Sequence, residues 1–193
     1  MTGAVLRYLT HPQVNVDPNV PVPEWGLSDV GAERVHKLCN SATLTKTTRV
    51  VSSAETKTTE AAEILGNSLG IKPEAREKMH ENDRTSTGFL ESAAFEDMAD
   101  RFFANPDITV EGWESASAAQ ARIVGEVQAV LASHKEGDLL LIGHGAVGTL
   151  LYCHFSGIPI DRKHDQTGGG GNFITIEIAS LKVQHGWRPM EEM

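Results

Sequence analysis

The chain has 193 residues, which is one domain's length, and 40% of them are hydrophobic, enough for a core. Its 17 basic and 26 acidic residues give a net charge of −9, which argues against nucleic acid and anionic membranes as partners because both bind a basic surface. The two cysteines, Cys39 and Cys153, are too few and too far apart for a disulfide framework. With no apolar run near ~20 residues and a strand at the start, we expect a cytoplasmic protein.

Strand-like and helix-like segments alternate along the sequence. Residues 3–10 predict a first strand, and residues 12–27 follow as a proline-rich loop long enough to suggest a functional role. The later predicted elements, in chain order, are a helix capped by Ser28, a strand at 49–52, a helix at 56–69, an edge strand at 71–76, a helix from about 115 to 134, a strand at 138–142, a helix at about 146–155, and a hairpin of strands at 173–178 and 182–187.

Residues 79–110 fit no simple strand–helix unit. They contain a helix-like stretch at 95–103, and we interpret them as a small helical lobe inserted over the site. The rest of the pattern predicts a single domain over residues 1–193, folded as a three-layer α/β/α sandwich. Its sheet is expected to be mostly parallel, with strand 138–142 near the centre because it is the most apolar, and with the terminal hairpin as an antiparallel edge.

Two histidines follow predicted buried strands. His11 comes after the first strand and His144 after the strand at 138–142. In open α/β sheets, ligands bind at the carboxyl ends of the strands. A histidine in either place alone is more typical of a half-buried structural side chain, but the matched pair predicts a shared site.

Residues 143–148 allow two interpretations, because they match the glycine pattern G-x-G-x-x-G between a strand and a helix. One is a dinucleotide site, which the short remainder of the chain disfavours. The other is an anion site, because free backbone N–H groups at a helix start favour a phosphate. Gly145 would then contribute to phosphate binding beside His144.

Five segments, taken together, resemble the histidine phosphatase superfamily, the phosphoglycerate-mutase-like proteins. The resemblance spans residues 5–148 and is carried by the segments Leu9-Thr10-His11-Pro12, Leu27-Ser28-Asp29-Val30-Gly31, Ser52-Ser53-Ala54-Glu55-Thr56-Lys57 with Ala61-Ala62, His80-Glu81-Asn82, and Gly143-His144-Gly145. By motif position the resemblance implies that His11 is a nucleophile that becomes phosphorylated, that Glu81 is the general acid and base, and that His144 donates a hydrogen bond to the phosphoryl group. The other histidines are scattered, and no pair has the i, i+4 spacing of a helical zinc site with a third ligand nearby, so we expect no metal and no cofactor.

At two positions the sequence departs from the family pattern in a way that is expected to weaken phosphate binding. Thr10 stands where the family has an arginine, so that Thr-His-Pro replaces Arg-His-Gly, and Lys57 stands where it has a second arginine. Lysine is a point charge, whereas arginine binds phosphate through two parallel hydrogen bonds. We expect Thr10 and Lys57 to bind the phosphate nonetheless. Compensation for the missing charge is expected from Arg84, or alternatively from Thr85, Ser86 or Thr87.

The sequence therefore leaves two main hypotheses. The first is an enzyme that hydrolyses a small phosphomonoester or a phosphoprotein through phosphohistidine. The alternative is a protein of the same fold that has lost catalysis and binds a phosphorylated ligand as a sensor or scaffold. Residues 12–27 and 79–110 are expected to set specificity. The terminal hairpin or an exposed edge strand could pair two chains as a homodimer.

Overall fold

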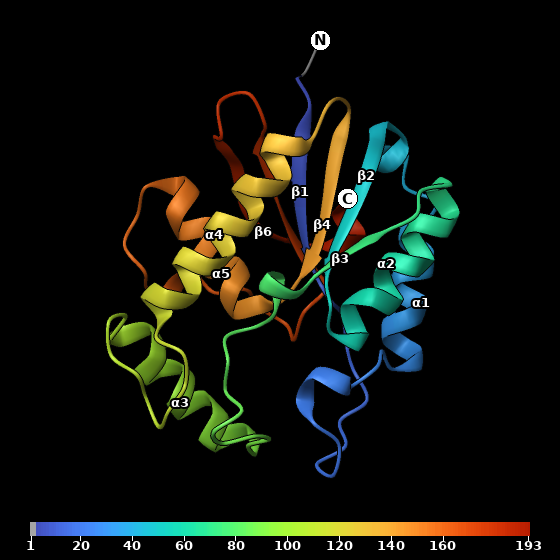
Figure 1. Ribbon diagram of the computed structural model, residues 1–193. Coiled ribbons are helices and arrows are strands. Elements are labelled where there is room, and N and C mark those ends of the chain that lie inside the picture. Colours follow the sequence, from blue (N-terminus) through green and yellow to red (C-terminus); the bar gives the residue numbers. More distant parts are fainter. Residues whose placement is uncertain (1–2) are drawn as a thin grey trace.

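The computed structural model describes residues 3–193, and these build one six-stranded sheet with helices on both faces (Figure 1). The strands lie in the order β3-β2-β4-β1-β5-β6. The strands β3, β2, β4 and β1 pair in parallel, whereas β5 pairs antiparallel with β1 and β6 pairs antiparallel with β5. The predicted parallel sheet with an antiparallel edge is confirmed. The bounds are β1 (Val5–Thr10), β2 (Thr47–Ser53), β3 (Glu74–Arg76), β4 (Asp138–Gly143), β5 (Asn172–Glu177) and β6 (Val183–Pro189).

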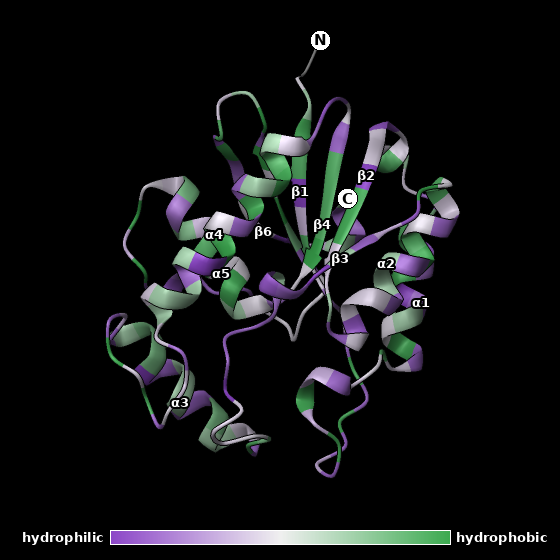
Figure 2. Cartoon of the chain, in the orientation of Figure 1, coloured by the Kyte–Doolittle hydropathy of each residue, from purple (hydrophilic) through white to green (hydrophobic). Residues whose placement is uncertain are grey.

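Alternate residues of β4 face two separate cores, as the strand's period of two requires. Leu139 and Leu141 pack against α4 (Ala116–Ser133) and α5 (Gly145–Ser156), while Leu140 and Ile142 pack against α1 (Asp29–Leu38) and α2 (Thr56–Leu69). Every residue of β4 is buried. In Figure 2, which colours the chain by hydropathy, the strands in the middle of the molecule carry the most hydrophobic residues. The predicted three layers and the central place of β4 are confirmed.

Local signals define several element ends. Ser28 caps α1 as expected, because its hydroxyl accepts a hydrogen bond from the N–H of Gly31. Gly70 ends α2 in the left-handed conformation, which glycine adopts without a steric cost. The edge strand is shorter than predicted: β3 begins only at Glu74, because Pro73 has no N–H to donate to a neighbouring strand.

Two segments extend beyond the carboxyl ends of β1, β2 and β4. One is the loop at 12–27, which is closed by an isolated bridge between Val14 and Leu27 and contains a short 3₁₀ helix at Val22–Glu24. The other is the lobe predicted at 79–110, whose helix α3 spans Ser92–Ala104. Both lie at the edge to which the β4 arrow points in Figure 1. None of the helices within residues 3–193 has the length and apolar character to cross a membrane.

Candidate active site

The two histidines meet because their strands are neighbours. In the parallel pair of β1 and β4, Thr10 lies opposite Gly143, and the backbone N–H of His11 donates to the carbonyl of Gly143 over 3.0 Å. The residue that follows each of these strand ends is a histidine, so the paired register brings the two histidines together. The ring centroids of His11 and His144 lie 5.3 Å apart, with one ring edge facing the other at 70°.

The half-buried ring of His11 is held in one tautomer. Its Nδ1 lies 2.9 Å from the carbonyl oxygen of Pro12, which can only accept, so Nδ1 carries the proton and Nε2 keeps its lone pair. Burial lowers the pKa of His11 to about 4, against the opposing effect of that hydrogen bond. The imidazole is therefore neutral at pH 7, the state that a nitrogen nucleophile needs.

His144 is completely buried at the start of α5. The hydroxyl of Tyr8 accepts a hydrogen bond from its backbone N–H and donates one to its carbonyl, over 3.0 and 3.1 Å. Neither ring nitrogen has a hydrogen-bond partner among residues 3–193. Burial lowers the pKa of His144 well below its usual value, while the carboxylate of Glu55 acts in the opposite direction. A buried polar ring without a partner is costly, which is typical of a site that awaits a ligand.

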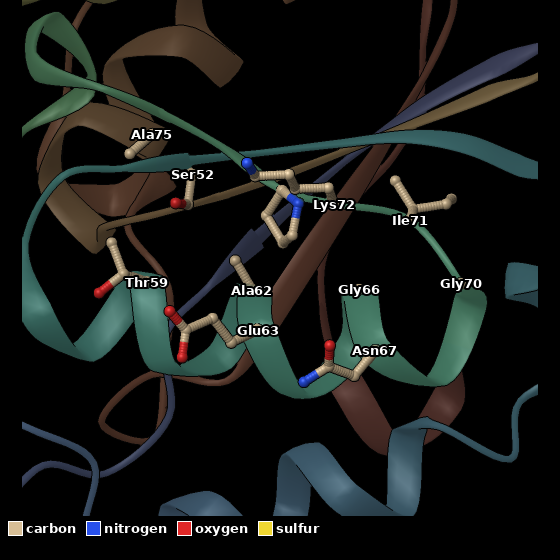
Figure 3. A pocket seen from close by; sticks show the side chains of 11 residues that line it. Ser52, Thr59, Ala62, Glu63, Gly66, Asn67, Gly70, Ile71, Lys72 and Ala75 are labelled. Atoms are coloured by element: carbon tan, nitrogen blue, oxygen red, sulfur yellow. The ribbon is translucent and has the colours of Figure 1, made fainter.

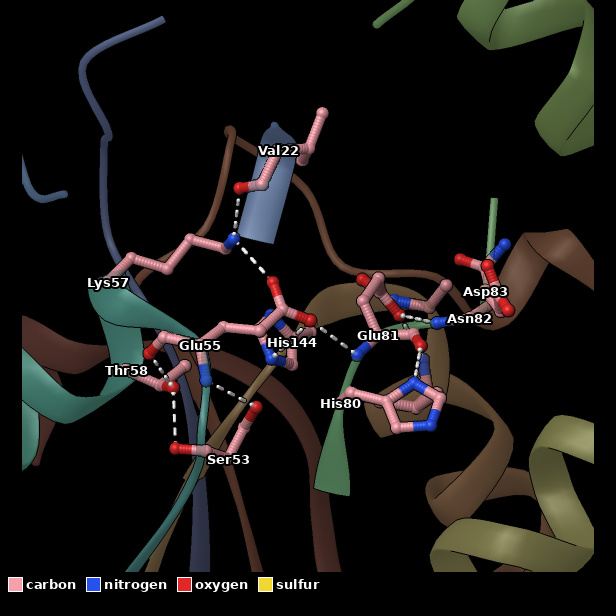
Figure 4. Close-up of polar contacts among 12 residues, drawn as sticks. Val22, Ser53, Glu55, Lys57, Thr58, His80, Glu81, Asn82, Asp83 and His144 are labelled. Atoms are coloured by element: carbon pink, nitrogen blue, oxygen red, sulfur yellow. Dashed lines mark hydrogen bonds and ion pairs between the residues drawn. The ribbon is translucent and has the colours of Figure 1, made fainter. Parts of the chain in front are cut away.

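Glu55 joins the site from the start of α2, and the sequence analysis did not single it out. Its Oε2 accepts from Lys57 Nζ over 2.5 Å, and its Oε1 accepts from the backbone N–H of Glu81 over 3.0 Å (Figure 4). The same Oε1 lies 3.5 Å from His144 Nε2. Burial raises the pKa of Glu55, but His144 and Lys57 outweigh it and lower the pKa to about 2. Lys57 also donates to the carbonyl of Val22, so its ammonium is already paired.

Glu81 occupies the place where we expected an external anion. Its carboxylate accepts from the backbone N–H groups of Val147 and Ala146 at the N-terminus of α5, over 3.0 and 3.2 Å. The expectation of a free anion site at this helix start was wrong, because the chain supplies its own carboxylate there. Burial raises the pKa of Glu81, with hydrogen bonds from Val147 and Asn82 opposing it. A raised pKa favours a carboxyl group that can donate a proton near neutral pH.

Arg84 places its guanidinium on the wall of the cavity that contains the histidines. It stacks 4.9 Å from the centroid of the Phe95 ring and forms no hydrogen bond or ion pair with any residue from 3 to 193 through its side chain. Burial lowers its pKa, yet an arginine stays protonated at physiological pH. Unlike the ammonium of Lys57, the guanidinium of Arg84 therefore has N–H donors available for a ligand, although Glu81 and Glu55 also act on its charge.

Two predicted phosphate ligands lie outside this cavity. The hydroxyl of Thr10 accepts from the N–H of Asn172 over 3.0 Å and donates to Gln166 Oε1 over 2.7 Å, which uses its hydrogen-bonding capacity. A Cβ added at Gly145 would collide with the side-chain amide nitrogen of Gln166, so that amide would have to move to admit a side chain. Neither residue lines the cavity with His11.

The glycine pattern at 143–148 also has a packing explanation. A Cβ at Gly143 would collide with the phenol ring of Tyr8, and a Cβ at Gly148 would lie 2.6 Å from Tyr8 and 2.9 Å from Trp187. The glycines leave room for these aromatic rings. Together with the carboxylate of Glu81 at the helix start, this removes the basis for a dinucleotide site.

The cavity itself measures about 810 Å³ and lies between the two extended segments. Trp25 from the 12–27 loop and Phe89 from the lobe approach to 5.8 Å between ring centroids. The lining includes residues from both segments and from the strand ends: His11, Val14, Pro21, Val22, Pro23, Glu24, Trp25, Ala54, Glu55, Thr56, Lys57, Glu77, His80, Glu81, Asn82, Asp83, Arg84, Thr85, Gly88 and His144.

A second cavity, of about 540 Å³, lies along α2 beside β3 (Figure 3). Glu63 and Lys72 are its only charged lining residues, and no histidine or cysteine reaches it. Residues 3–193 also contain no cluster of three or more His, Cys, Asp or Glu side chains placed to hold a metal ion. The histidine cavity is therefore the better candidate for an active site.

Paired histidines, a buried carboxyl group and an arginine thus line one cavity at the carboxyl edge of the parallel strands, where open α/β proteins bind ligands. The family model of the histidine phosphatase superfamily (branch 1) matches residues 18–180. The chain belongs to this superfamily. Searches among curated proteins found no match.

Solved structures of the same fold cover nearly the whole chain. The mycobacterial glucosyl-3-phosphoglycerate phosphatase shares 18% identity with a TM-score of 0.76, over 96% of both chains. The protein YhfR of Bacillus stearothermophilus shares 19% identity with a TM-score of 0.79, over 95% of both chains. A putative alpha-ribazole-5'-P phosphatase of Escherichia coli shares 16% identity with a TM-score of 0.69, over 96% of both chains. At these identities the likeness shows the fold.

Proposed function

We propose that the protein is a phosphohydrolase that acts on a phosphomonoester, of a small molecule or of a phosphoprotein, through a phosphohistidine intermediate on His11. The observation that carries this proposal is the state of His11. Its Nδ1 donates to Pro12, and burial keeps the imidazole neutral, so the lone pair of Nε2 is available beside His144.

In the first step, His11 Nε2 attacks phosphorus and the bond from phosphorus to the leaving oxygen breaks. Glu81, whose pKa is raised by burial, acts as the general acid and gives a proton to that oxygen. Arg84 and His144 donate hydrogen bonds to the phosphoryl oxygens, which is the main contribution a protein makes to phosphoryl transfer. The product alcohol leaves, and Glu81 remains as a carboxylate.

In the second step, the carboxylate of Glu81 takes a proton from water, and the water oxygen attacks the phosphorus of phospho-His11. The bond between phosphorus and Nε2 breaks, which restores the neutral imidazole and releases inorganic phosphate. The carboxyl group of Glu81 is protonated again, so the cycle needs no cofactor.

Among the cations expected to bind phosphate, we assign the direct contact to Arg84. Lys57 is paired with Glu55, so we assign it an indirect part through that carboxylate. Thr10 and Gly145 take no part in this proposal, because neither lines the cavity and the hydroxyl of Thr10 is hydrogen-bonded elsewhere.

The paired charge of Lys57 favours a second candidate, a phosphate-binding protein without turnover. A pocket that loses the use of one cation binds the charged transition state less well. Both candidates predict binding of inorganic phosphate or vanadate, but only the hydrolase predicts covalent phosphorylation.

Acid-stable and acid-labile phosphate on the protein should be compared after brief incubation with radiolabelled substrates from a phosphoester panel. We expect acid-labile label on the wild type, and its loss together with activity in His11→Ala. His36→Ala is the matched control, because His36 is an exposed histidine on α1. Full activity in His11→Ala would overturn the proposal, and the absence of turnover on the whole panel would favour the binding protein.

A further inference from the structure

We propose that Glu55 is a positioning residue for His144: it holds the ring in place and provides the counter-charge that lets it become an imidazolium when a phosphoryl group binds. This inference rests on the proposed function, whose mechanism needs a donor at His144. It does not follow from the motifs of the sequence, in which Glu55 stands between the better-marked Ser53 and Lys57.

The backbone of Glu55 is fixed from both sides. Its N–H donates to Ser53 Oγ over 3.3 Å, and its carbonyl accepts from the hydroxyl of Thr58 over 2.7 Å. Thr58 also donates to the carbonyl of Ser53 over 3.0 Å. Although Glu55 is the residue that precedes α2, its side chain does not cap the helix. The carboxylate is therefore free to point into the cavity from a rigid base.

The carboxylate of Glu55 connects three parts of the site (Figure 4). It accepts from Lys57 of α2 and from the backbone N–H of Glu81, and it lies 3.5 Å from Nε2 of His144 at the start of α5. The side chain is 9% exposed. A carboxylate so enclosed, with a separate partner for each oxygen, keeps one orientation.

His144 needs such a partner because its other charged neighbours oppose protonation. His11 after β1, Lys57 on α2 and His80 at the start of the lobe each disfavour a positive charge on the ring, and Glu55 favours it. When phosphate enters, its negative charge adds to that of Glu55. The ring then takes up a proton from solvent, and both nitrogens become donors, of which Nε2 faces Glu55.

The test compares the protonation of His144 in wild type, Glu55→Gln and Glu55→Asp, by pH titration of its imidazole nitrogens in NMR spectra with saturating inorganic phosphate. A His144→Gln variant assigns the signals. Glu63→Gln is the matched control, because it makes the same change at an exposed position of α2. Circular dichroism and thermal unfolding show that each variant is folded.

We expect the pKa of His144 to fall by about one unit or more in Glu55→Gln and to remain unchanged in Glu63→Gln. Glu55→Asp keeps the charge, so it should retain most of the wild-type value, and it serves as the reporter if Glu55→Gln does not fold. In turnover, kcat should fall at least tenfold in Glu55→Gln with a smaller change in KM, and the alkaline limb of the pH profile should move to lower pH.

Equal titration of His144 in wild type and Glu55→Gln would overturn the inference, as would a fall in Glu55→Asp as large as that in Glu55→Gln. The NMR titration needs no turnover. A wild type that never forms phosphohistidine would therefore refute the proposed function, while the effect of Glu55 on His144 would be measured independently.

Discussion

Lys57 Nζ lies 2.5 Å from Glu55 Oε2, and the two side chains are only 4% and 9% exposed. The lysine that stands where this family has an arginine is therefore matched by a carboxylate two residues earlier. A buried ion pair adds little net stability, because desolvation of both charges cancels most of the attraction. Removing only one partner is strongly destabilising, because the other charge then stays buried without a counter-ion.

We predict that Lys57→Met destabilises the fold by about 3–5 kcal/mol, because it leaves Glu55 buried and without its cation. Urea unfolding gives the free energy directly. Lys37→Met is the control, because Lys37 pairs with Glu33 on an exposed face of α1 and should show no measurable change. The double variant Glu55→Gln/Lys57→Met should recover most of the loss. A loss in Lys57→Met as small as in Lys37→Met would contradict the buried pairing.

The ion pair of Glu55 and Lys57 was hard to predict from the sequence because it depends on the backbone geometry at the start of α2. Residues two apart do not face each other on a helix. Glu55 precedes α2, with extended backbone angles of −72° and 144°, and this lets its side chain turn back toward Lys57. Nothing in the spacing of the sequence indicates that turn. The placement of Glu81 at α5 has a similar cause, because the contact with Val147 joins residues 66 positions apart.

The fold was easier to predict from the sequence than the site, because it depends on the periodicity of hydrophobic residues and not on single contacts. The run at 138–142 is the most apolar of the predicted strands, which predicted its central place, and β4 is indeed buried at every position. The two strand-end histidines followed from the same runs, since adjacent parallel strands end at one edge. The start of β3 follows from the local effect of Pro73, whereas the pairing of Thr10 with Gln166 joins residues 156 positions apart and has no local signal.

Arg84→Met should weaken transition-state binding, because it removes the one cation of the cavity that has no protein partner among residues 3–193. Loss of a charge-assisted hydrogen bond costs about 1.5–3 kcal/mol, which lowers kcat/KM by roughly 10- to 100-fold. Steady-state kinetics with a substrate from the phosphoester panel measures this fall in kcat/KM. Arg101→Met is the control, because Arg101 lies on α3 and pairs with Glu111 at the surface. Equal kinetics in both variants would remove Arg84 from the site.

The acidic limb of the kcat/KM profile should lie near pH 4, where the nucleophile His11 gains its proton. An ordinary histidine would place this limb near its usual pKa of 6.5. The measurement needs a substrate whose phosphate ionisation is titrated separately. Controls of residual activity after incubation at each pH separate protonation from unfolding. An acidic limb near 6.5 would mean that His11 is not buried as described.

The same pKa has a consequence for stability. Since His11 binds its proton near pH 4 in the folded state and near 6.5 in the unfolded state, the unfolded chain holds more protons between these values. The free energy of unfolding should therefore fall as the pH drops through this window, and the His11→Asn variant should lose that part of the slope. Urea unfolding between pH 4 and 7 compares the two proteins.

Gly143→Ala should destabilise the protein by about 1–3 kcal/mol, the usual cost of overpacking a core. The new methyl group would collide with Tyr8, which also holds the backbone of His144. Gly125→Ala is the control, for which we expect a gain in stability instead of a loss. Gly125 lies exposed on α4 with open space around its Cβ, so the substitution should stabilise the helix by about 0.4–1 kcal/mol. Thermal unfolding of both variants tests the pair.

Glu81→Gln should separate the two steps of the proposed reaction. With p-nitrophenyl phosphate the leaving group needs no proton, so His11 should still be phosphorylated and release a burst of p-nitrophenol. Hydrolysis of phospho-His11 needs the carboxylate as a base, so turnover should then fall by about 10²- to 10⁴-fold and labelled protein should accumulate. With an alkyl phosphate, whose leaving oxygen needs the proton of Glu81, neither burst nor label should appear.

Rapid mixing with a denaturing alkaline quench, in which phosphohistidine survives, measures both quantities, and Glu63→Gln should behave as the wild type because Glu63 is exposed on α2. Glu81 also accepts hydrogen bonds at the start of α5, so the thermal stability of each variant is compared first. If Glu81→Gln lost the burst with p-nitrophenyl phosphate while remaining folded, Glu81 would serve to position His11 or the phosphate instead of moving a proton. A loss confined to alkyl phosphates would leave Glu81 as the acid but give the task of activating water to another group.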